Sequence, residues 1–183
     1  EKDRMHTEPG LPQRRAEPPD TKLPWRDLEE TAAEERVLRG ESLLVLGIAG
    51  TGKTHYVQGI VERLRHEGKK VSVVSKTHTA SRRAGGDTAD HWVRRHILHG
   101  SATCDYLWID EVSQVDVGLL NQIAKLAFTP MRFLLSGDFH QFPPIANHWR
   151  GSPVPEDALE RSALLHALAG GNRVTLTECR RGD

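Results

Sequence analysis

The sequence has little cysteine and no long apolar run. Its 183 residues include two cysteines, Cys104 and Cys179, which are too few for a disulfide scaffold and suit a reducing compartment. No apolar stretch approaches the roughly 18 residues of a membrane-spanning helix. The first ten residues, EKDRMHTEPG, lack the apolar core that a signal peptide carries. We therefore expect a soluble, intracellular protein with no membrane partner and no disulfide partner.

An excess of charge of one sign is also lacking. Lys and Arg together number 25 and Asp and Glu together number 25, so the overall charge does not indicate a polyanion-binding protein. Such a partner would have to bind a local patch. Segment 63–99 is the candidate patch, because it contains nine Lys or Arg against three acids. Hydrophobic residues make up 37% of the chain, which is enough for a globular core.

The composition divides the chain into a tail and one domain. Residues 1–25 contain five of the ten prolines, many charges and few apolar side chains, so we expect a flexible tail there. The remainder, residues 26–183, has the length of one ordinary domain. Its first segment, RDLEETAAEERVLRG, predicts a helix over 26–40, with Asp27 placed at its start and Gly40 at its end.

Strand and helix patterns alternate through this domain. Short apolar runs predict about five strands, and apolar residues at helical spacing predict helices between them. The expected strands are SLLVLGIAG, KVSVVS, CDYLWID, MRFLLSGD and RVTLTE, and the later helices are expected near 54–68, 87–98, 117–128 and 156–168. Continuous apolar strands separated by helices are typical of an α/β fold, with a parallel sheet covered by helices on both faces.

One segment matches the phosphate-binding P-loop pattern without a mismatch. Residues 47–54, GIAGTGKT, fit G-x-x-x-x-G-K-[ST] and lie between a predicted strand and a predicted helix. The candidate nucleotide-binding residues are Gly47, Gly50, Thr51, Gly52, Lys53 and Thr54. Backbone amides and the helix N-terminus hold phosphate in such loops. Lys53 is expected to reach the β and γ oxygens of ATP, and the Thr54 hydroxyl to bind Mg²⁺.

Two carboxylates follow another apolar strand. Leu107-Trp108-Ile109 leads directly into Asp110 and Glu111. Ligands collect at the carboxyl ends of strands in open α/β sheets. We therefore expect Asp110 to hold Mg²⁺, mostly through water, and Glu111 to act as general base for the attacking water. Taken alone, the dipeptide is also compatible with an exposed acidic turn.

A third strand, MRFLLSGD, leads into a loop that contains Gln141. If this strand lies beside the Asp110 strand, Gln141 is positioned to contact the γ-phosphate or its water and to report hydrolysis. On spacing alone, a polar residue that faces solvent is the more common outcome.

Five segments, in the expected order, resemble motifs I, Ia, II, III and IV of the superfamily 1 DNA helicases. They are GIAGTGKT at 47–54, KTHTAS at 76–81, WIDEVSQVD at 108–116, LLSGDFHQFPPI at 134–145 and LTECRR at 176–181. Within that superfamily the segments are most similar to the RecD and PIF-type branch. The resemblance covers about residues 40–183. It implies a P-loop NTPase with a RecA-like fold, ATP and Mg²⁺ as cofactors, and single-stranded DNA as a partner.

The resemblance also assigns roles to residues outside the P-loop. It implies that Gln141 senses the γ-phosphate and that Arg181 approaches it as an arginine finger. Arg180, at a position that is usually aromatic, is the other candidate for this role, and a surface ion pair is the alternative to it. The implied contacts to the DNA backbone are Thr77, His78 and Ser81.

Two departures from the family pattern affect the interpretation. Glu30 stands where the family usually carries a glutamine that reads adenine, so base selectivity stays open. The chain stops two residues after LTECRR, so we expect the second RecA-like domain, with motifs V and VI, to be absent from it. The sequence thus predicts the first motor domain of an ATP-dependent DNA helicase, with weak ATP hydrolysis in isolation. The alternative is a stand-alone nucleotide-dependent switch that binds DNA or protein without unwinding.

Overall fold

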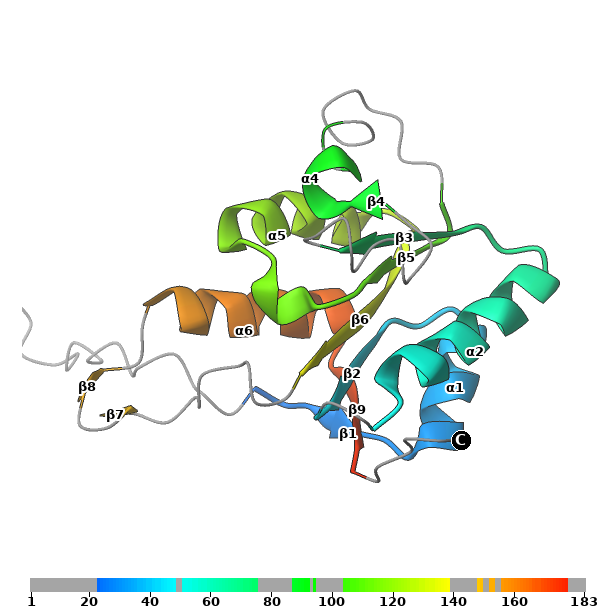
Figure 1. The fold of residues 1–183 in the computed structure, drawn as a ribbon, viewed down its shortest axis with the longest axis horizontal. Coiled ribbons are helices and arrows are strands. Elements are labelled where there is room, and N and C mark those ends of the chain that lie inside the picture. Colours follow the sequence, from blue (N-terminus) through cyan, green and yellow to red (C-terminus); the bar gives the residue numbers. More distant parts are fainter. Residues whose placement is uncertain are drawn as a thin grey trace, which may run out of the picture.

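The structure, a computed structural model, describes residues 23–48, 51–75, 87–92, 94, 104–138, 148–149, 152–153 and 156–177. The helices are α1 (Glu30–Leu38), α2 (Lys53–His66), α4 (Ala89–Trp92), α5 (Val117–Ala124) and α6 (Glu156–Ala169), with 3₁₀ turns η2 (Val112–Gln114) and η3 (Lys125–Phe128). The strands are β1 (Arg26–Asp27), β2 (Leu43–Gly47), β3 (Val71–Ser75), β4 (Asp87–Thr88), β5 (Tyr106–Ile109), β6 (Arg132–Asp138), β7 (His148–Trp149), β8 (Ser152–Pro153) and β9 (Asn172–Leu176). Figure 1 shows their arrangement.

Seven of these strands form one sheet in the order β1-β9-β2-β6-β5-β3-β4, and β7 pairs with β8 separately. The five longer strands of the sheet are those that the sequence predicted, and two-residue strands flank them at both edges. Every pairing within the sheet is parallel. Because β6 pairs with β2 on one side and β5 on the other, the carboxyl ends of these three strands lie together at one edge.

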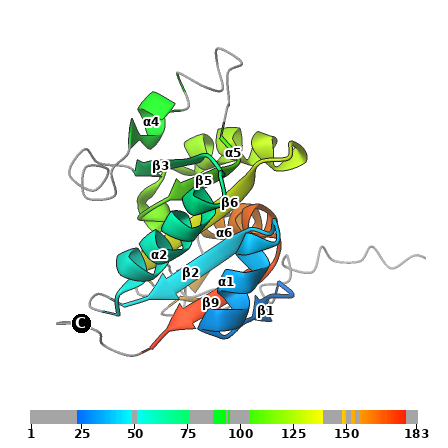
Figure 2. The ribbon, with the colours of Figure 1, turned by 90° about the vertical axis from the view of Figure 1, so that its right-hand side faces the viewer.

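Helices cover both faces of the sheet, as the apolar strands predicted (Figure 1, Figure 2). Helices α1 and α2 pack on one face, called here the α2 face, where Val57 and Leu64 are fully buried. Helices α5 and α6 pack on the other, the α6 face, where Leu120 is fully buried. Neighbouring strand residues point to opposite faces, so Trp108 packs on the α2 face and Ile109 on the α6 face.

The helix predicted over 26–40 begins later than the sequence indicated. Helix α1 starts at Glu30 and ends before Gly40, whereas residues 26 and 27 form β1 and pair with β9. Asp27 is therefore not a helix cap. Its carboxylate accepts two hydrogen bonds from the Arg173 guanidinium, at 2.6 and 3.1 Å, and these bonds lower the pKa of Asp27.

Two further expectations on local structure differ from the structure. The sequence predicts a tail up to residue 25, but the Trp25 ring lies edge-on to the His166 ring with centroids 4.9 Å apart. The helix predicted over 87–98 appears as β4 followed by the four residues of α4, and most of the remaining positions lie outside the described residues. Trp92, the last residue of α4, is 2% exposed and belongs to the core.

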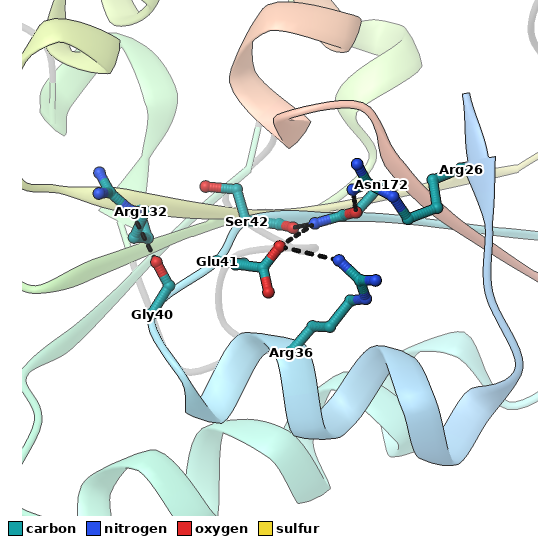
Figure 3. A network of polar contacts seen from close by, with 7 residues as sticks. All are labelled: Arg26, Arg36, Gly40, Glu41, Ser42, Arg132 and Asn172. Atoms are coloured by element: carbon teal, nitrogen blue, oxygen red, sulfur yellow. Dashed lines mark hydrogen bonds and ion pairs between the residues drawn. The ribbon is translucent and has the colours of Figure 1, made fainter. Parts of the chain in front are cut away.

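Polar contacts close the amino-terminal edge of the sheet (Figure 3). Asn172, at the start of β9, donates to the Glu41 carboxylate at 3.3 Å and to the Ser42 carbonyl at 3.0 Å. Arg36 of α1 pairs with the same carboxylate at 3.2 Å, and Arg132 of β6 donates to the Gly40 carbonyl at 2.7 Å.

A cavity of about 280 Å³, lined partly by Ser42, lies at this edge. It is thus at the opposite end of β2 from the P-loop.

Of the helices in the described part of the chain, none combines the length and apolar character that crossing a membrane demands.

Candidate functional site

The P-loop segment connects a central strand to a helix, as its sequence predicted. Strand β2 ends at Gly47, which lies between Asp138 of β6 and Leu176 of β9 in the sheet register. Helix α2 begins at Lys53. Within the loop itself, residues 49 and 50 lie outside the described residues, so the role of Gly50 stays a prediction.

The carbonyl oxygen of Ile48 organises the loop. It accepts hydrogen bonds from the Thr51 amide at 3.2 Å, the Thr51 hydroxyl at 2.7 Å and the Lys53 ammonium at 3.1 Å. Thr51 is fully buried, so its hydroxyl fixes the turn from inside the loop. The Lys53 side chain therefore runs back over the loop that precedes it, whereas the Ile48 side chain is exposed.

Two glycines of the pattern are required by the backbone. A Cβ on Gly47 would lie 2.4 Å from the Thr51 hydroxyl and 3.1 Å from the Leu176 carbonyl oxygen, so a side chain there would displace the buried threonine. Gly52 has φ +81°, in the left-handed region that glycine adopts without steric cost. The P-loop pattern in the sequence thus corresponds to packing and dihedral requirements of this loop.

The amino end of α2 carries positive charge that nearby acids do not neutralise. The first turn of this 14-residue helix contains no acidic residue, and helix N-termini carry a partial positive charge. Within the described residues, no carboxylate lies within ion-pair distance of Lys53. Thr54 is exposed in the same turn. This end of the helix therefore has the features of an anion-binding site.

Asp110 and Glu111 follow β5 at the same edge of the sheet. The Asp110 amide donates to the Val74 carbonyl at 2.9 Å, which extends the β5–β3 pairing by one position. Its carboxylate oxygen Oδ1 accepts hydrogen bonds from the Ser136 hydroxyl at 2.8 Å and the Glu111 amide at 2.9 Å. Asp110 is half-buried, so the carboxylate is held from the sheet side and is still accessible.

Side-chain alternation places this acid on the same face as the P-loop helix. Along β5, Tyr106 and Trp108 pack on the α2 face, and Asp110 continues that series. Only β6 separates β5 from β2, so the two strand ends are ~10 Å apart at the usual strand spacing. The Asp110 carboxylate and the Thr54 hydroxyl both lie at the carboxyl-terminal edge of the sheet, on the α2 face. Such oxygen groups are ligands that suit Mg²⁺.

Glu111 adopts a backbone conformation that the sequence did not indicate. Its φ of 51° and ψ of 44° lie in the left-handed region, and among the described non-glycine residues it alone has a positive φ. This conformation costs a non-glycine residue roughly 1–2 kcal/mol. It turns the chain sharply between β5 and η2, and such strain is typical of functional sites. In the sequence, only the pair of acidic residues marked this position as a candidate site, and that pair does not indicate the backbone conformation.

Several predicted site residues lie outside the described residues. They are Gly50, Gln141 and Arg181 for the nucleotide, and Thr77, His78 and Ser81 for DNA. The structure does place β6, which leads toward Gln141, directly beside β5, as the prediction for this glutamine required. The roles of all six residues stay predictions.

A parallel sheet between two helical layers, with a glycine loop that joins a central strand to a helix, defines a P-loop NTPase of RecA-like fold. A profile of the AAA domain family matches residues 29–181. Because this match covers most of the sequence, the chain belongs to the AAA domain family.

Several proteins similar to this chain are helicases of the PIF1 type. The human ATP-dependent DNA helicase PIF1 is 28% identical over 171 aligned positions, and the match covers 79% of this chain and 26% of the human protein. The ATP-dependent DNA helicase RRM3 of Saccharomyces cerevisiae is 28% identical over 152 aligned positions, and the match covers 63% of this chain and 21% of RRM3. These findings confirm the resemblance to PIF-type helicases that the five motifs indicated.

Solved structures agree with these relatives. The crystal structure of the PIF1 helicase from Candida albicans superposes with a TM-score of 0.61 at 27% identity, covering 84% of this chain and 40% of that one. A Bacteroides PIF1 bound to single-stranded DNA superposes with a TM-score of 0.53 at 20% identity, covering 86% of this chain and 44% of that one, which shows the shared fold. The chain spans about a quarter of the length of the human relative.

Proposed function

We propose that this chain is the ATP-binding motor domain of an ATP-dependent DNA helicase, in which ATP hydrolysis is coupled to movement along single-stranded DNA. In this proposal residues 26–183 form the first RecA-like domain, and a second such domain completes the enzyme. The observation that carries the proposal is the amino end of α2, where Lys53 folds over a glycine loop and no described acid neutralises it.

Within the proposal, the P-loop residues bind the triphosphate. The backbone amides of the loop and the Lys53 ammonium hold the β- and γ-phosphates, and Gly47 and Gly52 permit the close approach of the backbone. Thr54 and Asp110 would hold Mg²⁺, directly or through water. Magnesium, when bound, neutralises charge on the phosphate oxygens.

The remaining residues act on the attacking water, the γ-phosphate and the DNA. Glu111 accepts the proton of the attacking water. Its left-handed backbone conformation sets the direction in which the side chain leaves the main chain. Gln141 and Arg181 keep the γ-phosphate roles that the family resemblance implied. Similarly, Thr77, His78 and Ser81 would contact the DNA backbone without reading its sequence.

The proposal is tested by ATP turnover with and without single-stranded DNA. We expect slow hydrolysis by this chain, stimulated by an oligodeoxythymidine strand, and a loss of at least about tenfold in Lys53→Ala. Lys69→Ala removes an exposed lysine beyond the far end of α2 and serves as the matched control. Turnover in Lys53→Ala equal to that of the parent would contradict the proposal. Nucleotide-dependent DNA binding without any turnover would favour a switch that does not translocate.

A further inference from the structure

Three buried or half-buried polar groups form a chain of hydrogen bonds behind the candidate metal-binding acid. The indole nitrogen of Trp108, on β5, donates to the Ser136 hydroxyl of β6 at 2.8 Å. That hydroxyl in turn donates to Asp110 Oδ1 at 2.8 Å. Trp108 is 1% exposed and Ser136 is fully buried, so the bond between them is shielded from water.

The chemistry of the three groups fixes the direction of this chain. An indole nitrogen donates and does not accept, so the Ser136 oxygen must be the acceptor in its bond with Trp108. The single hydroxyl hydrogen of Ser136 is then left for Asp110, which accepts when ionised. The hydroxyl hydrogen of Ser136 therefore points to Asp110, while the indole of Trp108, in the core of the α2 face, occupies the acceptor side of the same oxygen.

The two donors to Asp110 bind the same carboxylate oxygen. Oδ1 accepts from Ser136 and from the Glu111 amide, whereas no described residue donates to Oδ2. The terminal torsion of an aspartate side chain otherwise adopts a broad range of angles. Two donors on one oxygen restrict it and prevent rotation of the carboxylate. The second oxygen is thereby left available in a fixed direction.

From this geometry we infer that Ser136 is a positioning residue, which orients Asp110 so that Oδ2 is presented to the magnesium ion of the nucleotide complex. The inference rests on the proposed function, because it takes Asp110 as the acid that holds the metal. It adds a residue that neither the motif pattern nor its spacing had assigned. Groups that orient metal-binding carboxylates influence metal affinity by about 10–100-fold when removed.

The test measures the binding of a non-hydrolysable ATP analogue by calorimetry, once with excess magnesium chloride and once with EDTA. The ratio of the two affinities is the magnesium-dependent gain. In Ser136→Ala we expect this gain to fall by about tenfold or more, while the affinity in EDTA stays at the parental value. Ser136→Ala also leaves the buried indole donor of Trp108 without an acceptor, so its thermal midpoint should fall by roughly 3–6 °C.

Trp108→Phe is the matched control, because it removes the same Trp108–Ser136 bond and keeps the serine hydroxyl beside Asp110. We expect it to lower the thermal midpoint as well, but to keep the gain within about threefold of the parent. Should Ser136→Ala keep the full gain, or should both variants lose it equally, the positioning role is overturned. Should Ser136→Ala fail to fold, Ser136→Cys keeps the shape of the side chain, in a slightly larger form, with a weak donor, and its gain must also fall for the role to stand.

Asp110→Asn separates this inference from the proposed function. If Asp110→Asn abolishes the gain while Ser136→Ala does not change it, the inference alone fails. If Asp110→Asn keeps the full gain, Asp110 does not hold the metal, and that part of the proposed function fails together with the inference.

Discussion

At the scale of single residues, the site combines groups that the sequence identifies with groups that only the fold brings in. Lys53 and Asp110 are identifiable because their chemistry depends on residue type and spacing. Ser136 is not, since its role depends on a cross-strand neighbour and on complete burial. The strain at Glu111 is likewise invisible in the sequence, because nothing in the pattern D-E predicts a positive φ.

This strain leads to a prediction on stability. Glu111→Gly removes the steric cost of the left-handed conformation, and part of that gain is offset by the greater freedom of glycine in the unfolded chain. We expect Glu111→Gly to have a free energy of unfolding about 0.5–1 kcal/mol above that of Glu111→Gln, measured by urea denaturation. Both variants lose the carboxylate, so both should bind nucleotide and lose turnover by about a hundredfold or more. Equal stability of the two variants would show that the position is not strained.

At the scale of elements, contacts between distant segments decide what the sequence pattern leaves open. The spacing of Val57 and Leu64 predicts the buried side of α2 correctly, because it reflects one helix alone. The start of α1 was mispredicted because β9 pairs with residues 26 and 27, and Arg173 binds Asp27 from that strand. A helix prediction made from local propensity has no information about that partner.

A second contact between elements fixes the turn after the acidic pair. Arg161 of α6 donates to the carbonyl oxygens of Val112, at 3.2 Å, and Val115, so this helix holds η2 in place. Because η2 begins one residue after Glu111, we infer that α6 also restrains the position of that carboxylate. Arg161→Met removes both bonds, and each bond to a charged donor contributes roughly 1.5–3 kcal/mol where it is shielded from water.

We therefore expect Arg161→Met to lower the free energy of unfolding by about 1–3 kcal/mol and to reduce ATP turnover, with little change in nucleotide affinity. The matched control is Arg65→Met, which removes a guanidinium bond of 2.9 Å to the Val71 carbonyl at the start of β3, far from the site edge. Urea denaturation of the two variants measures the free energy of unfolding, and steady-state kinetics measure their ATP turnover. A turnover in Arg161→Met equal to that in Arg65→Met would contradict the coupling of α6 to Glu111.

At the scale of the whole molecule, the two ends of the sheet have different roles. The amino-terminal edge is closed by the contacts of Glu41, Asn172 and Arg132 (Figure 3), which join α1, β2, β6 and β9. The carboxyl-terminal edge carries the P-loop and the acidic pair. The sequence predicted the alternation and the parallel sheet, whereas the strand order, with β6 between β2 and β5, required the structure. That order determines how far Asp110 lies from the P-loop.

Calorimetric titration of this chain with ATP and magnesium measures directly whether the loop between β2 and α2 binds a nucleotide. We expect saturable binding at one site, weakened at least about tenfold in Lys53→Ala and unchanged in Lys69→Ala, because the ammonium of Lys53 binds phosphate and that of Lys69 does not. Absence of binding by the parent chain, or equal affinity in Lys53→Ala, would contradict the claim that the loop between β2 and α2 holds a nucleotide.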